Sequence, residues 1–268
     1  MKIGIDLGGS LIKTACLENE TLTLKKYSLA EFDQLIAWLH RFDSPEICIT
    51  GGRAFQLKSR ITENVTDIVE FAATIKGSMH LLHKEGLSLD SYILTNVGTG
   101  TSIHAVLQGK HERLGGTGVG GGTLMGLSKL LTGITDFDEI VTKASSGTRS
   151  RIDMKVSDIY RGSIPPIAGD LTASNFGKLF AEDVREVHSV EDLLSSVVGI
   201  VGETVATTSV LAAGQYKDLS IVYIGSTFNK NKPLQDVVYD YTNLRGATPI
   251  FLKQGEFCGA IGALLSIG

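Results

Sequence analysis

Residues 4–13 read GIDLGGSLIK, and this stretch near the start of the chain decides the fold class. Asp6 stands at the end of an apolar strand pattern, and Gly8-Gly9 supplies a turn before a second strand pattern at 11–17. A dinucleotide-binding loop needs G-x-G-x-x-G ahead of a helix, and a Walker loop needs G-x-x-x-x-G-K-[ST]. Neither spacing occurs in this stretch, so strand–turn–strand predicts a hairpin whose glycines admit phosphate oxygens to backbone N–H groups.

A second stretch repeats this design. Residues 91–108, SYILTNVGTGTSIHAVLQ, read as an apolar strand, a turn rich in Gly and Thr, and another strand. Internal repetition of one structural unit indicates a duplicated architecture. We therefore expect an α/β protein with two facing sheet halves, residues 1–94 and 95–268, each with a phosphate hairpin. Because no linker rich in Pro or Ser separates them, the halves are expected to form one hinged unit.

The remaining pattern alternates strands and helices. Strands are predicted at 2–6, 22–27, 46–50, 67–71 (DIVEF), 220–227 and 247–253. Helices are predicted at 32–39, 72–84, 190–215, 234–244 and 257–265, and residues 115–131 read as a glycine loop that runs straight into a further helix. Core-facing side chains are predicted at Ile75, Met79 and Leu82 of one helix and at Leu124, Leu127, Leu130 and Leu131 of another. The long helix 190–215 is apolar enough to be core or a dimer interface. Residues 110–113, KHER, read as a solvated turn.

Composition narrows the class of protein. The 268 residues are 43% hydrophobic and 20% charged with a net charge of −4, which is typical of a soluble globular protein and argues against binding to nucleic-acid backbones. We find no signal peptide and no uninterrupted membrane-spanning stretch. The cysteines Cys16, Cys48 and Cys258 lack metal-ligand spacing and suit buried positions in a reducing compartment. The sequence predicts a cytoplasmic protein.

The hairpins suggest nucleotide chemistry. Two glycine turns, one from each half, can hold the β- and γ-phosphates of ATP from both sides. Asp6 could hold Mg²⁺ directly or through water, since hard cations take oxygen ligands. Lys13 could reach a phosphate, although a solvated strand residue is nearly as good an interpretation. The glycine run 115–122 is either a flexible loop or, because it opens into a helix, an anion site at a helix N-terminus, and we favour the anion site.

Six motifs in order carry a family resemblance. They are GIDLGGSLIK, VEF (69–71), NVGTGTS (96–102), ERLGGTGVGGGTLMGL (112–127), PPIAGDLTASNFG (165–177) and YIGSTF (223–228). Together they resemble the type II pantothenate kinases in their short bacterial form, over essentially the whole chain. The resemblance implies the duplicated actin-like (ribonuclease H-like) ATPase fold of the actin and hexokinase superfamily. It also implies a homodimer, its dimerisation helices in the C-terminal half, that uses ATP and Mg²⁺ to convert pantothenate to 4'-phosphopantothenate, the first step of coenzyme A biosynthesis.

The same resemblance implies roles for individual residues. Glu70 matches the family's general base and Arg113 its active-site arginine, expected near the substrate hydroxyl and the transferring phosphoryl group. Residues expected to bind the substrate are Glu70, Thr99, Thr101 and Arg113, and Asp6 is the expected metal ligand. Those expected at the nucleotide are Asp6, Leu7, Gly8, Gly9, Ser10, Leu11, Ile12, Lys13, Thr99, Gly121, Gly122, Thr123, Leu124, Met125, Phe137 and Ser226.

One departure and two alternatives accompany this interpretation. The family usually has an acidic residue after the VEF phenylalanine, whereas Ala72 and Ala73 follow here. A kinase of another small hydroxylated metabolite, such as N-acetylglucosamine, would use the same fold, although the zinc-binding cysteine cluster of a large sugar-kinase group is missing. The other alternative is a nucleotide-switched actin-like protein without a small-molecule substrate. His104, His111 and His188 lack metal spacing and read as surface or structural residues.

Overall fold

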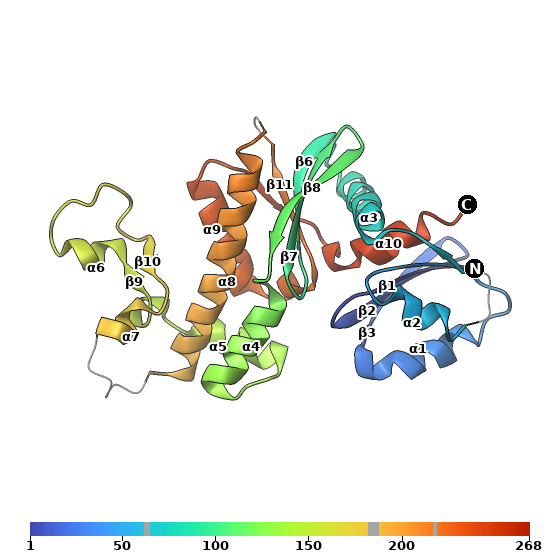
Figure 1. Ribbon diagram of the computed structural model, residues 1–268, viewed down its shortest axis with the longest axis horizontal. Helices are drawn as coiled ribbons and strands as arrows, with labels where there is room; N and C mark the ends of the chain where they lie inside the picture. The colour runs from blue at the N-terminus through green and yellow to red at the C-terminus, as the bar shows by residue number, and fades with distance from the viewer. Residues whose placement is uncertain (62–64, 182–187, 217–218) are drawn as a thin grey trace.

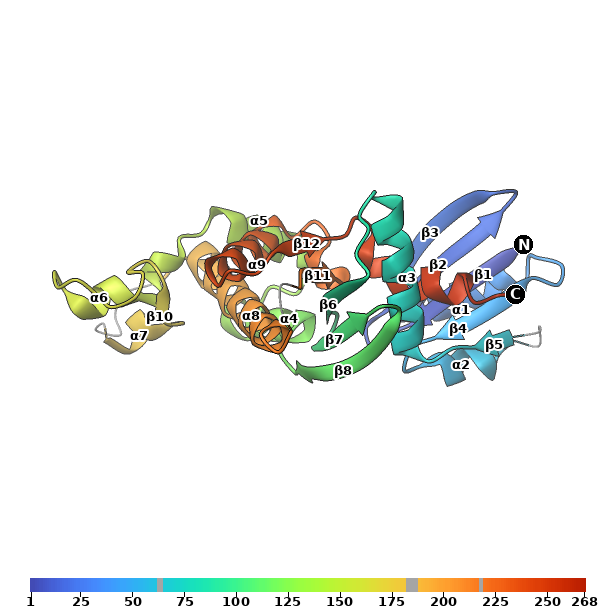
Figure 2. The ribbon, with the colours of Figure 1, turned by 90° about the horizontal axis from the view of Figure 1, so that it is seen from above.

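A computed structural model describes residues 1–61, 65–181, 188–216 and 219–268 of the chain. Figure 1 shows an elongated molecule in which two sheets lie side by side and a small arm extends from one end. The view from above shows α3 and α10 between the two sheets (Figure 2).

The N-terminal sheet has five strands in the order β3-β2-β1-β4-β5. They are β1 Lys2–Leu7, β2 Leu11–Glu18, β3 Thr21–Ser28, β4 Glu46–Thr50 and β5 Val65–Asp67. The first three form an antiparallel meander, and β4 and β5 extend the sheet in parallel from β1.

The second sheet repeats this topology. Its strands are β6 Ser91–Val97, β7 Thr101–Leu107, β8 Lys110–Thr117, β11 Ile221–Ile224 and β12 Pro249–Phe251. The order β12-β11-β6-β7-β8 again places an antiparallel meander beside two parallel strands. The predicted duplicated α/β fold is thereby confirmed. The division of the chain at residue 94 stays a prediction; that position lies inside β6.

Two helices fill the space between the sheets. α3 Glu70–Lys84 follows β5, and α10 Cys258–Leu264 brings the end of the chain back against β1. Gly77 and Gly262 lie where these helices cross, and a Cβ at either position would collide with the backbone of the other helix, at Cys258 and Ala73. Glycine at the crossing therefore allows the two backbones to touch. The N-terminal sheet is covered on its other face by α1 Phe32–Leu39 and α2 Ala54–Lys58.

The outer face of the second sheet carries four helices: α4 Gly121–Thr132, α5 Phe137–Ser146, α8 Val190–Ala213 and α9 Lys232–Leu244. α8 is long and apolar enough to cross a membrane, yet 61% of its most apolar window is buried inside the protein. Valines spaced along it, such as Val197, Val201 and Val205, are fully covered. This burial is what a core helix of a globular protein shows.

The arm consists of short elements for which the sequence pattern gave no prediction. They are β9 Met154–Lys155, α6 Val156–Tyr160, β10 Thr172–Ser174 and α7 Gly177–Ala181 (Figure 1). Single 3₁₀ turns lie at Leu29–Glu31, Arg149–Arg151, Ser226–Phe228 and Gly255–Phe257. Arg149 attaches the arm to α8 through Glu203, which also accepts hydrogen bonds from Thr172 and Asn175 at 2.8 and 3.1 Å.

Three predictions of local structure were wrong. DIVEF is not one strand, because β5 ends at Asp67 and Glu70 begins α3. KHER is not a turn: it belongs to β8, and the turn lies before it at Gln108-Gly109, where both residues have positive φ. Residues 115–117 likewise belong to β8 rather than to a glycine loop.

Side-chain burial also differs from two of the predicted helix faces. Met79 is 42% exposed, and Leu130 and Leu131 are 80% and 41% exposed. Ile75, Leu82 and Leu124 are buried as predicted. In each of these helices the apolar residues of the sequence therefore cover a wider face than the one that the fold buries. All three cysteines are buried, as the composition predicted.

Candidate active site

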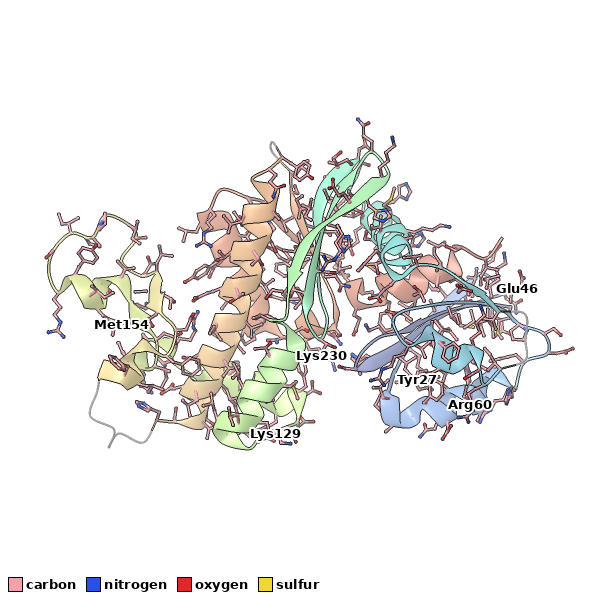
Figure 3. The ribbon with its side chains drawn as sticks, in the orientation of Figure 1. Tyr27, Glu46, Arg60, Lys129, Met154 and Lys230 are labelled. Carbon is pink, nitrogen blue, oxygen red and sulfur yellow. The ribbon has the colours of Figure 1, made fainter. Side chains whose placement is uncertain are left out.

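A cleft of about 930 Å³ separates the two sheets. Both glycine hairpins, the first turns of α3, α4 and α5, and the segments after β11 and before α10 contribute to its wall. Lys230, which lines it, lies between the two halves in Figure 3. Of the predicted site residues, the cleft brings together Asp6, Gly8, Gly9, Ser10, Leu11, Lys13, Glu70, Thr99, Thr101, Gly121, Gly122, Met125, Phe137 and Ser226.

The tips of the two hairpins meet across the cleft. In the first hairpin, the Gly8 N–H donates to the Leu11 carbonyl at 3.1 Å and closes the turn. The hydroxyls of Ser10 and Thr99 then lie 2.9 Å apart and share a hydrogen bond that joins the two halves. A phosphate chain bound by both turns would therefore lie next to these two hydroxyls.

The start of α4 is docked on the second hairpin. The N–H groups of Gly121 and Gly122 donate to the carbonyls of Gly98 and Thr99, both at 2.8 Å. These are two of the N–H groups that a helix start leaves free for an anion. The anion site expected at this terminus is thus already partly used by the hairpin. A Cβ on Gly121 would stand 2.5 Å from Thr227 Oγ1, so glycine here serves close packing.

Asp6 is the buried carboxylate of the site. Its side chain is 13% exposed, and Lys13 Nζ lies 3.8 Å from Oδ2. Burial raises the pKa of Asp6, and the charge of Lys13 opposes that rise. Gly259 of α10 and Gly51 after β4 make room for the carboxylate, since a Cβ at either would approach its oxygens to 2.6 and 2.8 Å.

A row of charges crosses the N-terminal sheet at this point. Asp6, Lys13 and Lys26 are cross-strand neighbours on β1, β2 and β3, and all three line the cleft. Lys26 pairs at 2.9 Å with Glu256, from the turn before α10. Each lysine is paired with a carboxylate, so the row adds no net charge, but it places two ammonium donors beside the first hairpin, where phosphates would lie.

Glu70 is the first residue of α3, at the edge of the cleft. Partial burial raises the pKa of Glu70, and the negative charge of Asp6 raises it further. Lys13 and the backbone N–H of Gly52 act in the opposite direction. The position at a helix start favours the carboxylate form. Thr74, one turn further along α3, lines the same wall.

Arg113 owes its direction to a β-bulge. The register between β7 and β8 shifts between Ile103 and His104, so that Arg113 stands opposite His104 and Leu114 is the extra residue. A one-residue change of register moves a side chain to the other face of a sheet. The bulge therefore turns Arg113 toward α3, while Leu114 packs in the core beside α8. Nη2 of Arg113 lies close to Gly116, because a Cβ added to Gly116 would come within 3.1 Å of it.

Several predicted site residues lie elsewhere. Arg113 is exposed and does not line the cleft. The side chains of Leu7, Ile12 and Leu124 are packed in the hydrophobic core. The Leu7 carbonyl accepts from the Arg53 N–H and the Leu124 N–H donates to the Gly120 carbonyl, so these backbone groups are already in use. Thr123 donates its hydroxyl to the Gly118 carbonyl at 3.0 Å and shapes the loop before α4. Thr101, although in the cleft wall, donates its hydroxyl to the Val119 carbonyl at 2.8 Å.

The sequence reasoning missed other lining residues: Lys26, Phe71, Thr74, Asn96, Asp136, Asp138, Asn229, Lys230 and Glu256. Cross-strand pairing of the second and third strands would have located Lys26 opposite Lys13. Helical spacing from Glu70 would have located Thr74. Glu256 carries no local signal, because a distant part of the chain brings it to the cleft.

The donor set fits a magnesium ion that is shared with substrate phosphates. Among the described residues, no group of three or more His, Cys, Asp or Glu side chains could enclose a metal. Mg²⁺ typically keeps several waters and takes one or two carboxylates together with phosphate oxygens. Asp6 lies buried beside the phosphate hairpin, and within the described parts of the chain its carboxylate accepts no hydrogen bond and has Lys13 as its ion-pair partner, so it is suited to that role.

Comparison with solved structures defines the class of protein. The fold is similar to that of the activator of the 2-hydroxyisocaproyl-CoA dehydratase from Clostridium difficile, with a TM-score of 0.66, 13% identity, and coverage of 99% of this chain and 93% of that one. The duplicated sheets and the cleft with two glycine hairpins define a duplicated actin-like fold. The family follows from sequence. A family model, Fumble, matches residues 21–266, and the chain belongs to this family, that of the type II pantothenate kinases.

Named relatives match over nearly the full length. A type II pantothenate kinase from Bacillus cereus is 45% identical over 267 residues, 98% of this chain and 96% of the relative. Another from Staphylococcus saprophyticus is 42% identical over 264 residues, 98% of this chain and 99% of the relative.

Proposed function

We propose that this protein phosphorylates pantothenate with ATP, giving 4'-phosphopantothenate at the first step of coenzyme A biosynthesis. The observation that carries the proposal is one cleft that holds Glu70, Asp6 and both glycine hairpins. A binding module with a nucleotide switch needs the hairpins, but it does not need a carboxylate of raised pKa at the cleft edge.

The phosphates of ATP would lie between the hairpins, against Gly8, Gly9 and Thr99, with Lys13 and Lys26 beneath them. Phe137, Met125, Ser226 and Lys230 would surround the rest of the nucleotide. Mg²⁺ held by Asp6 would neutralise part of the phosphate charge.

Glu70 would accept the proton of the primary hydroxyl of pantothenate as that oxygen attacks the γ-phosphorus. The bond between that phosphorus and the β–γ bridging oxygen breaks, and ADP leaves. Phosphoryl transfer depends mainly on positioning and on neutralisation of charge. Lys13 and Lys26 from the cleft wall, together with Arg113 from β8, would contribute to the second task.

Further properties belong to the same proposal. The protein is a cytoplasmic homodimer that does not bind nucleic acid and does not enter a membrane. Support for the dimer comes from the arm, where Ile164 and Phe180 are each 96% exposed and Ile159 and Ile167 are each 57% exposed. Large apolar side chains grouped in this way mark protein interfaces.

Ala72 stands where the family usually has an acidic residue, so Glu70 is the carboxylate that this turn of α3 provides.

The test is release of ADP from Mg·ATP with and without pantothenate, for the parent and for Glu70→Gln. We expect pantothenate-dependent turnover that falls by about 10²–10⁴-fold in the variant, because a positioned base contributes that much. Glu85→Gln, at the other end of α3, is the matched control and should retain activity. Parent turnover that ignores pantothenate would refute the proposal, and N-acetylglucosamine in its place would test the sugar-kinase alternative.

A further inference from the structure

His104 is a buried histidine without a partner. It lies on β7 with 2% of its surface exposed, and neither Nδ1 nor Nε2 has a hydrogen-bond partner among the residues that the structure describes. Buried polar side-chain atoms in proteins nearly always have a partner, so a buried group without one calls for an explanation.

The surroundings of His104 keep its ring neutral. Burial, together with the positive charge of His111 and Arg113, lowers the pKa of His104 to about 4. On one side the ring of Phe71 lies against it, with centroids 4.5 Å apart and planes at 49°. A neutral imidazole has one nitrogen that accepts a hydrogen bond. Phe71, the residue after Glu70, covers the imidazole ring on the side of α3.

Arg113 is the complementary group. The bulge places it directly opposite His104 on the neighbouring strand and on the same face of the sheet. In the described part of the chain, its guanidinium forms no ion pair and no hydrogen bond within the structure. The Arg113 guanidinium thus has five N–H donors without an acceptor, and the neutral His104 ring beside it has one accepting nitrogen without a donor.

We propose that His104 is a positioning residue: its neutral imidazole accepts a hydrogen bond from Arg113 when pantothenate is bound and holds the guanidinium at the mouth of the cleft beside Glu70. The inference rests on the proposed function. A carboxylate in the same place would cancel the positive charge that the transferring phosphoryl group needs. A neutral acceptor fixes the direction of the guanidinium and leaves its charge available.

The first variant is His104→Phe, which keeps an aromatic ring against Phe71 and removes the acceptor. We expect kcat to fall about tenfold or more, with KM for ATP and the thermal unfolding temperature close to the parent values. His104→Gln, which restores an acceptor, should recover part of the loss. His111→Phe is the control, since this exposed histidine lies on the same face of β8 and is expected to leave kcat unchanged.

A double-mutant cycle with Arg113→Ala then tests whether the effect of His104 on kcat depends on the Arg113 guanidinium. If His104 acts through Arg113, His104→Phe has no further effect once the guanidinium is gone. Losses that multiply, or full activity of His104→Phe alone, overturn the inference. Should that variant fail to fold, His104→Leu, which also lacks an acceptor, carries the same cycle. A parent without pantothenate-dependent ADP release is a distinct result, which overturns the proposed function and this inference together.

Discussion

At the scale of residues, the site is controlled by the interplay of a few charges in a partly enclosed cleft. Asp6 and Glu70 are both carboxylates, but Asp6 is buried next to Lys13 whereas Glu70 stands at an exposed helix start. Burial raises the pKa of both, and Asp6 raises that of Glu70 further. Asp6 is therefore suited to binding a cation, and Glu70 is suited to accepting a proton.

The raised pKa of Glu70 predicts a pH dependence. The base works as a carboxylate, so kcat/KM should fall as the pH drops through that pKa. Because the pKa lies above the ordinary glutamate value, the acid limb should begin at a higher pH than an unperturbed glutamate would give. A pH profile of kcat/KM for pantothenate measures it, and a flat profile down to the ordinary range would contradict the assignment.

Asp6→Asn should lower the pKa of Glu70, since it removes the negative charge that helps to raise it. Titration of the Glu70 carboxyl by ¹³C NMR without ligands checks this independently of magnesium binding. Asp67→Asn, on the surface of β5 and paired with Lys58, is the matched control, and the Glu70 titration should not move. An unchanged or higher pKa in Asp6→Asn would exclude the charge coupling.

At the scale of elements, glycines decide how closely helices approach the hairpins. α4 shows the contrast within a single helix. A Cβ on Gly121 would meet Thr227 Oγ1 at 2.5 Å and the Gly98 carbonyl at 2.9 Å, whereas nothing lies within 4 Å of a Cβ on Gly126. The first glycine is required by packing, and the second is tolerated in a helix that Ala would favour.

This contrast predicts opposite effects of one substitution. Gly126→Ala should stabilise the protein by about 0.5–1 kcal/mol, because alanine loses less backbone entropy than glycine in a helix interior. Gly121→Ala should destabilise it by about 1–3 kcal/mol through overpacking, and should raise KM for ATP by displacing the second hairpin. Urea unfolding curves and ATP kinetics measure both, and equal stability of the two variants would refute the docking argument.

At the scale of the whole molecule, the two halves meet at the Ser10–Thr99 hydrogen bond and through α3 and α10, while the arm extends outward (Figures 1 and 2). The arm is held to α8 by a buried charged network around Glu203. Its exposed isoleucines and phenylalanine are then free to contact a second copy. A firmly attached arm with an apolar outer surface is the feature that supports a dimer.

Charge on the arm should therefore break the dimer. Ile164→Asp combined with Phe180→Asp places two carboxylates in the proposed interface, where burying an unpaired charge is costly. Light scattering coupled to gel filtration should change from the mass of a dimer to the mass of a monomer. Tyr239→Asp and Leu244→Asp, exposed positions on α9, separate a general surface effect from the arm, and a parent that is already monomeric would refute the proposal.

The sequence by itself determined the elements whose signals are local: the two glycine hairpins, the buried strand 46–50, the long helix from residue 190, and hence the duplicated fold. Turn chemistry and hydrophobic periodicity act over a few residues, so they can be read directly. The family motifs named Glu70 and Arg113 but gave no geometry for either.

Only the tertiary structure decided what depends on distant contacts. It ended β5 at Asp67 and began a helix at Glu70, whose carboxylate accepts a hydrogen bond from the Gly52 backbone N–H in the segment after β4. It turned Arg113 toward α3 through a bulge that needs two strands to exist. It brought Glu256 to Lys26, which lies 230 positions away in the sequence. It also paired the first N–H groups of α4 with carbonyls of the second hairpin. Pairing between strands and close approach between backbones have no signature within a single segment, because each is a property of two segments together.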